Sequence, residues 1–374
     1  MKRATRKINK TKPQTGGNII GKEGAHGVAY NLDCGSPGKS LCSLLTPLKI
    51  TKIRFFCNAG PNRHITDKAL IAEFVEFLGS EKNRIAKIFK PKSVLSKTSV
   101  YSDFMEEIES NKAILRVYKD HAANFTTLSP VTGFKNLDII GLIVNFEKEE
   151  PLHVIMGTKC AGMPKINLDK FIIDMLSSIL ILQMAEYEHN DIKLDNIVKC
   201  NDRYKLIDWG QASPIGKTPI KMGSLFTTSP IRWYVSGHLA YISSEILAFK
   251  ANQNDPDYAK WQPFVKTNAK INSEFYDVVK ATPNRPALHK KYSKTFDLFM
   301  LGLTILHAVY KYKLDYTRYK PIIDKLTSLK SPQTPLLETL IFIKTQITMN
   351  TNNVEPKPLM ESIETLFELI STLK

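Results

Sequence analysis

Polar side chains able to bind a metal ion and to move a proton are concentrated in the stretch EHNDIKLDNIVKCNDRYKLIDWG, residues 188–210. Its apolar segments IVKC and YKLI flank a polar pair, so the spacing predicts a β-hairpin whose turn is centred near Asp202. A ladder symmetric about that residue places Asn196 opposite Asp208 at the open end of the hairpin. An amide and a carboxylate at such a point suit Mg²⁺, which takes few protein ligands and completes its shell with substrate phosphates. The stretch therefore predicts a metal site of the kind that holds a nucleotide.

Two further side chains in the same stretch suit group transfer rather than metal binding. Asp191 comes five residues before Asn196, so its carboxylate would accept the proton of an acceptor hydroxyl near the metal. Lys193 would offset negative charge on a transferred phosphoryl group. Asp195 and Asp202 are interpreted as turn carboxylates without a chemical role. Residue types and spacing together predict phosphoryl transfer.

The order of these residues resembles the catalytic loop and the metal-binding motif of the protein-kinase superfamily. The patterns HxDxKxxN and DxG are formed by His189, Asp191, Lys193, Asn196, Asp208 and Gly210. The resemblance implies ATP and Mg²⁺ as cofactors, Asn196 and Asp208 as metal ligands, and Asp191 and Lys193 as catalytic residues. In that family a lysine two residues after the catalytic aspartate accompanies Ser/Thr acceptors. A Ser/Thr protein kinase that acts on a protein substrate is therefore the expected function.

The segment IIGKEGAHGVAY resembles the glycine-rich loop of the same family, in which missing side chains let backbone N–H groups approach phosphates. The expected nucleotide-binding positions are Gly21, Gly24, Gly27 and Val28. Lys22 stands where the first glycine of GxGxxGxV belongs. We therefore expect a one-residue insertion at the front of this loop.

The resemblance also implies a strand lysine that contacts the α- and β-phosphates and is paired with a helix glutamate. The strand-like segment LKITKIRFF offers Lys49 and Lys52, which point to opposite faces because they are three residues apart. Lys52 is the preferred candidate because it shares a face with two apolar neighbours. In the helix expected over 66–78, Glu73 lies at the border of the apolar stripe and Glu76 lies nearly opposite it. Glu73 is therefore the preferred partner of the lysine.

Two other segments resemble parts of the family's cleft. LHVIMGTKCAG resembles the strand and hinge that hold an adenine ring, with Met156 at the back of the pocket and Gly157 to Lys159 along the hinge. KTFDLFMLGL resembles the start of a helix in the second lobe, where Asp297 enters an apolar segment. A buried carboxylate needs hydrogen bonds. Capping the backbone of the catalytic loop would supply them.

The sequence departs from the family pattern at two points. Asn190 stands where most protein kinases have an arginine that pairs with a phosphate on the activation segment. An amide cannot form that ion pair, so we expect activity without phosphorylation of the activation segment. The segment IRWYVSGHLAY has His238 where the family has a glutamate, with Glu245 as an alternative. The substrate-docking platform is therefore expected to differ.

The elements that must position these residues divide the 374-residue chain by composition. Residues 1–17 are expected to form a basic, flexible tail. Residues 18–158 alternate short strand-like segments with one main helix, which predicts a small antiparallel-sheet lobe. Residues 159–374 carry long helical apolar stripes, which predict a larger, mainly helical lobe with a polar insertion near 250–291. The expected fold class is α+β, with a bilobal, protein-kinase-like architecture.

Composition narrows the possible partners and compartments. The chain has 52 Lys and Arg against 36 Asp and Glu, and its formal net charge of +16 favours acidic or phosphorylated partners. Binding of nucleic acid by the tail is left open. The five cysteines contain no CxxC pair, so we expect reduced thiols, no disulfide framework and a cytoplasmic location. The longest apolar stretch, Phe296–Val309, is shorter than the roughly 20 residues that a membrane span needs.

Three finer interpretations remain open at this stage. The bias toward Lys, Asn and Ile, together with the altered motifs, resembles the divergent protein kinases of large DNA viruses, which would place the protein in the host cytoplasm or the virion. A pseudokinase scaffold is an alternative because the substrate platform is altered and the phosphate lysine is undecided. A small-molecule kinase of the choline or aminoglycoside type is another, because such enzymes often read HNDxxxxN as this chain does. Lys193 and the DWG sequence argue against that last alternative.

Overall fold

The computed structural model of the chain describes residues 27–35, 40–89, 97–117, 131–160, 163, 165–200, 202–215, 267, 270, 271, 274, 277, 285–328, 336–349, 363–368 and 371. Several sequence-based predictions lie outside the described residues. They concern the tail 1–17, the loop glycines Gly21 and Gly24, and the platform residues His238 and Glu245. Most of the insertion near 250–291 lies outside them as well.

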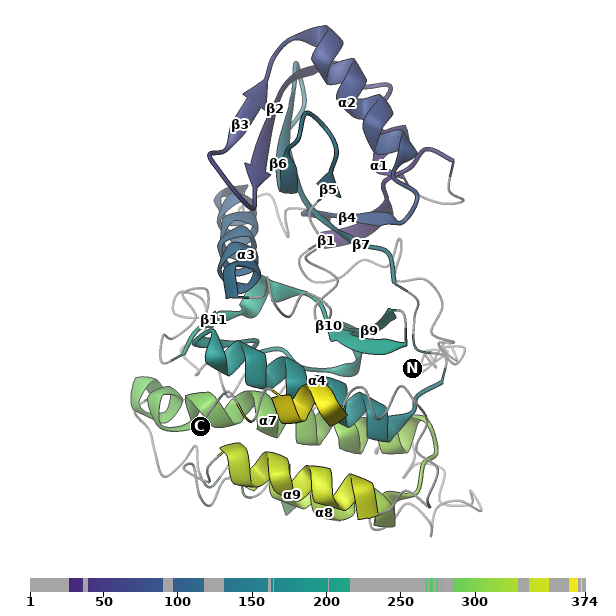
Figure 1. Ribbon diagram of the computed structural model, residues 1–374. Helices are drawn as coiled ribbons and strands as arrows, with labels where there is room; N and C mark the ends of the chain where they lie inside the picture. The colour runs from purple at the N-terminus through teal and green to yellow at the C-terminus, as the bar shows by residue number, and fades with distance from the viewer. Residues whose placement is uncertain are drawn as a thin grey trace, which may run out of the picture.

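The described residues form a smaller lobe built on an antiparallel sheet and a larger, mainly helical lobe (Figure 1). The chain passes from the first lobe to the second after strand β7 (Leu152–Thr158). This arrangement is an α+β fold of the bilobal, protein-kinase-like type, as the sequence predicts.

The sheet of the first lobe has seven strands, all paired antiparallel. Its strand order is β1-β4-β7-β6-β2-β3, and β5 pairs with β6 off this path. The strands other than β7 are β1 (Gly27–Asn31), β2 (Ile50–Cys57), β3 (Arg63–Ile65), β4 (Arg84–Phe89), β5 (Val131–Thr132) and β6 (Asp138–Phe146). The order is not the sequence order, because β1 pairs with β4 while the two strands between them in sequence lie at the opposite edge.

The segment between β1 and β4, called the inserted segment from here on, contributes both helices and strands to the lobe. It contains α1 (Leu41–Leu45) and α2 (Lys68–Ser80), whose first turns are capped by the side chains of Ser40 and Asp67. Strand β2 from the same segment pairs with β6, and β3 pairs with β2. The segment therefore widens the sheet by two strands and supplies two helices to the lobe.

The two faces of the sheet bury different side chains. One face packs against α1 and α2, with Phe55, Phe74 and Leu142 fully buried between them. The other face packs against α3 (Lys97–Val117), where Phe104 and Ile108 are fully buried. The sequence predicts only the helix over 66–78, which is α2, and misses α3. Figure 1 shows α3 on the side of the sheet that faces the helical lobe.

The helical lobe is organised around α4 (Leu168–Met184), which is buried along nearly its whole length. The long helices α7 (Arg285–Lys311), α8 (Tyr316–Leu326) and α9 (Leu336–Met349) pack beneath it in Figure 1. Short elements follow α4 in the chain, and β8 and β10 among them contact it. They are β8 (Tyr187–Glu188), η4 (Leu194–Asn196), β9 (Ile197–Cys200), β10 (Arg203–Leu206), η5 (Trp209–Gln211) and β11 (Ser213–Pro214).

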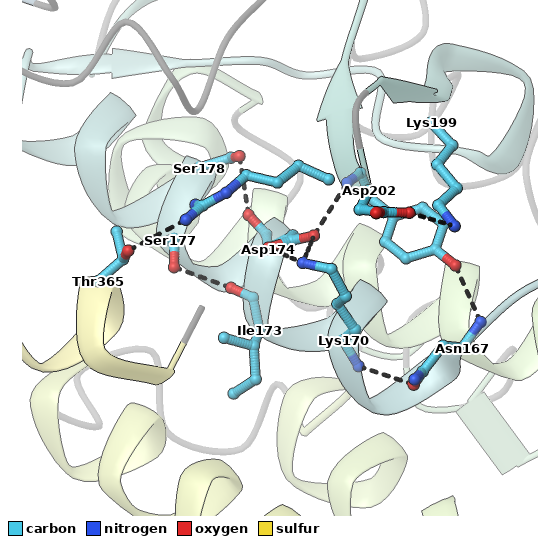
Figure 2. Close-up of polar contacts among 11 residues, drawn as sticks. Asn167, Lys170, Ile173, Asp174, Ser177, Ser178, Lys199, Asp202 and Thr365 are labelled. Atoms are coloured by element: carbon cyan, nitrogen blue, oxygen red, sulfur yellow. Dashed lines mark hydrogen bonds and ion pairs between the residues drawn. The ribbon is translucent and has the colours of Figure 1, made fainter. Parts of the chain in front are cut away.

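A buried carboxylate fastens the β9–β10 hairpin to α4 (Figure 2). Asp174 accepts hydrogen bonds from the backbone N–H of Tyr204 at 2.9 Å and from the ammonium of Lys170 at 3.2 Å. The hydroxyl of Tyr204 in turn accepts from the backbone N–H of Asn167 at 2.9 Å. Because Asp174 and Lys170 are both nearly inaccessible to solvent, these bonds fix the position of the hairpin on the helix.

Four of the five cysteines are joined in pairs. The structure contains disulfides between Cys34 and Cys42 and between Cys160 and Cys200, with Cα atoms 5.1 Å and 4.9 Å apart. Cys57 is a buried free thiol. The expectation of reduced thiols without a disulfide framework is therefore wrong for both pairs. Partners 40 residues apart are brought together only by the fold, and sequence spacing contains no sign of that contact.

None of the helices in the described ranges has the length and apolar character needed to cross a membrane.

Candidate active site

Lys87 stands at the centre of a three-residue charge cluster where the two lobes meet. Its ammonium lies 2.7 Å from the Glu107 carboxylate on α3 and 2.5 Å from the Asp208 carboxylate that follows β10. Strand alternation explains its direction, because Ala86 and Ile88 enter the core under α1 and α2 and Lys87 faces the other way. Burial acts to lower the pKa of Lys87, but the charges of Asp208 and Glu107 outweigh it and raise that pKa above its usual range. Lys87 is therefore positively charged at neutral pH and is held in place by its two carboxylate partners.

The predicted pair of Lys52 and Glu73 is not formed. Lys52 lies on β2 opposite Asn145 of β6, and the carboxylate of Glu73 is paired with Lys135 at 2.8 Å near the surface. Lys49, the other candidate, pairs with the exposed Glu147. Lys49, Lys52 and Glu73 all belong to the segment between β1 and β4, away from Lys87.

The physical reason for this correction is the connection between β1 and β4. A strand followed by a helix of three turns or more occurs both before α2 and before α3, and the sequence-based prediction rests on α2. The second is β4, reading RIAKIF, followed by α3. The available signal was Val100, Phe104 and Ile108 at helical spacing with Glu107 beside them.

The segment after β10 brings its carboxylate to Lys87 through an unusual backbone. Asp208 has a left-handed conformation with φ 67°, which is uncommon for a residue with a side chain and marks functional sites. Gly210 follows, and a Cβ there would lie 3.3 Å from the Glu107 carboxylate and 3.5 Å from that of Asp208. The absent side chain thus allows the segment to approach α3. The hydroxyl of Ser110 on α3 also donates to the Ala212 carbonyl at 3.3 Å.

The hairpin predicted from the sequence is present with its register shifted by one residue. Leu206 pairs with Ile197, and the backbone N–H of Ile207 donates to the Asn196 carbonyl at 2.9 Å. Asn196 is therefore opposite Ile207 instead of Asp208. The expected symmetry about Asp202 is wrong because that residue lies on one side of the turn, in a left-handed conformation with φ 63°.

The proposed catalytic residues contact one another directly. The Asp191 carboxylate accepts from the Lys193 ammonium at 2.6 Å and from the Asn196 amide nitrogen at 2.7 Å. That nitrogen also donates to the Asp191 carbonyl at 2.9 Å. Because the Asn196 nitrogen is engaged, its amide oxygen is the atom that a metal would use. Burial raises the pKa of Asp191, Lys193 counteracts this, and the charge of Asp208 adds to the increase.

The backbone of the catalytic loop is held by the carboxylate predicted for that role. Asp297 on α7 accepts hydrogen bonds from the backbone N–H groups of His189 at 2.7 Å and Asn190 at 2.9 Å. Burial raises its pKa to about 6, although both N–H groups act to lower it. The predicted capping of this loop is confirmed. Asn190 itself has φ 62°, so the two bonds hold a backbone conformation that a side chain disfavours.

His189 also holds the catalytic loop in position, from inside the core. Its ring is fully buried and lies against Trp209, with ring centroids 4.8 Å apart. One ring nitrogen lies 3.2 Å from the Ile207 carbonyl, and the other accepts from the Asp191 backbone N–H at 3.3 Å. Burial lowers the pKa of His189 to about 4. The ring is neutral at physiological pH and links the catalytic loop to the Asp208 segment.

The sheet register shows which predicted nucleotide contacts face Lys87. Ala29 and Ile155 lie directly opposite it on the neighbouring strands, and residues opposite one another in an antiparallel pair share a face. Val28 and Met156 instead enter the core on the other face. The register therefore places Ala29 and Ile155 on the face of Lys87, whereas Val28 and Met156, which were expected to contact a nucleotide, lie on the opposite face.

The remaining predicted positions lie near this face. Gly157 is opposite Ile85, two residues before Lys87, and Gly27 begins β1 opposite Phe89. Lys159 is exposed, and its backbone N–H donates to the Asn83 carbonyl at 3.0 Å. Gly157 and Lys159 border the segment that leaves β7 for the helical lobe, whereas Gly27 lies near the other end of β7.

The donor set near Asp208 fits a hard divalent cation. Asn196 provides an amide oxygen and Asp208 a carboxylate, and oxygen ligands of these kinds suit Mg²⁺. Across the described ranges, no group of three or more His, Cys, Asp or Glu side chains is arranged to hold a metal ion. A metal at this point would thus take ligands from a bound phosphate as well.

Solved structures of other proteins include chains that are similar to this one. No protein-family model matches the chain, and no curated protein matches it. The chain is similar to the kinase domain of a Toxoplasma gondii specific rhoptry antigen, at 11% sequence identity and a TM-score of 0.39. The similarity covers 92% of this chain and 94% of the other. Because this identity and TM-score are low, the fold class is assigned from the arrangement of the helices and strands described above.

Proposed function

We propose that the protein is a kinase that transfers the γ-phosphoryl group of ATP to a Ser or Thr hydroxyl of a protein substrate. The observation that carries the proposal is the contact of Lys87 with both Glu107 and Asp208. A lysine held by a helix glutamate beside a metal-binding aspartate is what phosphoryl transfer requires at the nucleotide phosphates. The nearby cluster of Asp191, Lys193 and Asn196 supports the same function.

Each residue has a role that its surroundings support. Lys87 would contact the nucleotide phosphates, and Glu107 would hold it in that position. Asn196 and Asp208 would hold Mg²⁺, which when bound neutralises charge on the phosphate oxygens. Asp191 would orient the acceptor hydroxyl and accept its proton, and Lys193 would stabilise the transferred group. The raised pKa of Asp191 favours its action as a base near neutral pH.

The identity of the acceptor and the compartment are the finer parts of the proposal. Lys193, two residues after Asp191, supports Ser/Thr acceptors through the family resemblance. We also propose, from the resemblance of the sequence alone, that the protein is of the type encoded by large DNA viruses. A cytoplasmic location stays a prediction, but its argument from reduced thiols no longer applies because of the two disulfides.

The proposal is tested with the purified chain, labelled ATP and Mg²⁺. Acidic proteins, basic proteins and amino alcohols are offered as acceptors. Label on Ser or Thr supports the proposal, label on an amino alcohol indicates a small-molecule kinase, and no transfer together with ATP binding indicates a pseudokinase. The decisive variant is Lys87→Met, for which we expect a loss of about 10²- to 10³-fold in kcat.

The matched control is Lys52→Met, which removes a lysine from the same sheet without touching the charge cluster. We expect it to retain activity. Equal loss in the two variants, or activity in Lys87→Met at the level of the unchanged protein, would contradict the role given to Lys87. Circular dichroism and thermal unfolding of both variants show whether they are folded.

A further inference from the structure

The disulfide between Cys160 and Cys200 joins two segments that border the proposed nucleotide site. Cys160 is the second residue after β7, on the segment that connects the sheet lobe to the helical lobe. Cys200 ends β9, whose first residue directly follows Asn196. The Cα atoms of the two cysteines are 4.9 Å apart. The bond therefore links the connection between the lobes to the hairpin that carries the proposed metal ligands.

Both ends of this link are coupled to groups in the site. Gly157, three residues before Cys160, lies opposite Ile85 on the strand that carries Lys87. On the other side, β9 pairs with β10, and β10 leads into Asp208. A displacement of the hairpin relative to the inter-lobe segment would thus change the position of Asp208 relative to Lys87. The disulfide limits that displacement.

The second disulfide is a suitable reference because it lies elsewhere. Cys34 and Cys42 are only 8 residues apart, and Cys42 is part of α1. A Cβ added at Gly79 of α2 would lie 3.4 Å from the Cys42 sulfur. This pair is therefore next to the helices on the sheet face opposite Lys87. Burial raises the pKa of the Cys57 thiol, so the remaining cysteine is a poor competitor in thiol exchange.

We propose that the bond between Cys160 and Cys200 positions the hairpin for ATP binding and acts as a redox switch of the proposed kinase activity. In the reduced state, two thiols react with glutathione disulfide. One sulfur–sulfur bond forms within the protein, and the two electrons and two protons that the thiols lose convert glutathione disulfide into two molecules of glutathione. Cys160 is partly exposed and Cys200 is buried, so exchange begins at the Cys160 sulfur.

This proposal rests on the proposed function, which identifies the site as a nucleotide site. Its test measures ATP affinity and does not require turnover. Oxidised protein should bind ATP with Mg²⁺ at least about 5-fold more tightly than reduced protein, the lower end of typical coupling between sites. In kinetics the same effect appears as a KM for ATP that rises on reduction.

The experiment equilibrates the full chain in two glutathione buffers, one mostly oxidised and one mostly reduced. Alkylation followed by mass spectrometry gives the state of each cysteine pair, and calorimetry gives the dissociation constant of ATP with Mg²⁺. The variant Cys160→Ser with Cys200→Ser should have the reduced-state affinity in both buffers. The control variant Cys34→Ser with Cys42→Ser should keep the full response. If the first variant does not fold, the comparison of the two buffers on the unchanged protein and on the control variant still decides.

The outcomes separate the switch from the kinase activity. Tighter ATP binding on oxidation without any phosphoryl transfer supports the switch and contradicts the proposed function. Transfer with equal ATP affinity in both buffers supports the function and overturns the switch. A response that disappears in the Cys34 and Cys42 control variant also overturns it, as does a Cys160–Cys200 pair that stays in one state in both buffers. Absence of ATP binding in both states overturns both proposals.

Discussion

At the scale of single residues, the site depends on charged groups held by partners on different elements. Lys87 contacts carboxylates from α3 and from the segment after β10, and Asp191 contacts an ammonium and an amide. Each group is thus fixed before any ligand binds. Such preorganisation is the main source of electrostatic stabilisation in enzymes.

The first prediction concerns Asp191 as the base. Replacing Asp191 with Asn should lower kcat by about 10²- to 10⁴-fold, because proton transfer from the acceptor is lost. The KM for ATP should change little, since the change leaves Lys87 and Asp208 in place. The matched control is Asp195→Asn, an exposed carboxylate four residues away in the same loop. Unchanged turnover of Asp191→Asn would remove the residue's assigned role.

The pH dependence of the reaction tests the same residue independently. Because burial raises the pKa of Asp191, the base is protonated, and inactive, at a higher pH than an ordinary aspartate. The acid limb of kcat/KM should therefore lie above the usual range of aspartate and disappear in the Asp191→Asn variant. A profile that is flat down to the ordinary aspartate pKa would contradict the assignment.

At the scale of elements, a neutral hydrogen bond joins the loop of Asn190 to strand β11. The Asn190 amide donates to the hydroxyl of Ser213 on β11 at 3.0 Å, and both residues are buried. The bond joins an amide and a hydroxyl and includes no charged group. The contact needs no modification to form.

We therefore predict that the proposed kinase activity does not depend on phosphorylation of the activation segment that the family resemblance implies. Phosphatase treatment should leave the initial rate unchanged, with mass spectrometry to confirm that the protein carries no phosphate. Asn190→Ala and Ser213→Ala should each remove this hydrogen bond and lower the initial rate. The initial rate of the double variant should be no lower than that of the more affected single variant, because both changes remove the same bond. Complete inactivation by phosphatase would refute this prediction.

The elements also show how far the sequence alone leads. The proposed catalytic residues Asp191 and Lys193 and the proposed metal ligand Asn196 stand within one local segment, and their mutual contacts follow from local spacing. The capping by Asp297 was predictable because a buried carboxylate requires donors. Lys87 and Glu107 were missed because the inserted segment repeats the strand-then-helix pattern ahead of them. Val28 and Met156 were placed on the wrong face because a shift of one residue along a strand reverses the direction of the side chain.

At the scale of the whole molecule, buried titratable groups make stability depend on pH in opposite directions. Burial, with a contribution from Asp297, raises the pKa of Glu188 from 4.5 to about 9. A carboxyl whose pKa is raised by folding stabilises the folded state at low pH, and that contribution is lost as pH rises from 4.5 to 9. His189 and His307, whose pKa values burial lowers to about 4, act in the opposite sense as pH falls from 6.5 to 4.

Glu188 provides the testable case. The unchanged protein should lose stability between pH 6 and pH 9, and Glu188→Gln should lose clearly less, because the glutamine has no proton to release. Urea unfolding at both pH values measures the difference. The control is Glu186→Gln, an exposed carboxylate two residues away, which should follow the unchanged protein. An equal loss in Glu188→Gln would show that the carboxyl is not protonated in the folded state.

The way the inserted segment joins the sheet has a consequence for the order of folding during synthesis. Strand β2 pairs with β6, and the Thr51 hydroxyl donates to the carbonyl of Asn145, 94 residues further along the chain. A nascent chain that ends before β6 has the helices α1 and α2 but lacks the strand against which β2 must pair. Pairing over such a separation is slow because the intervening loop must close first. The sheet lobe therefore completes its core only after β6 has left the ribosome, and until then the apolar face of β2 depends on protection from aggregation.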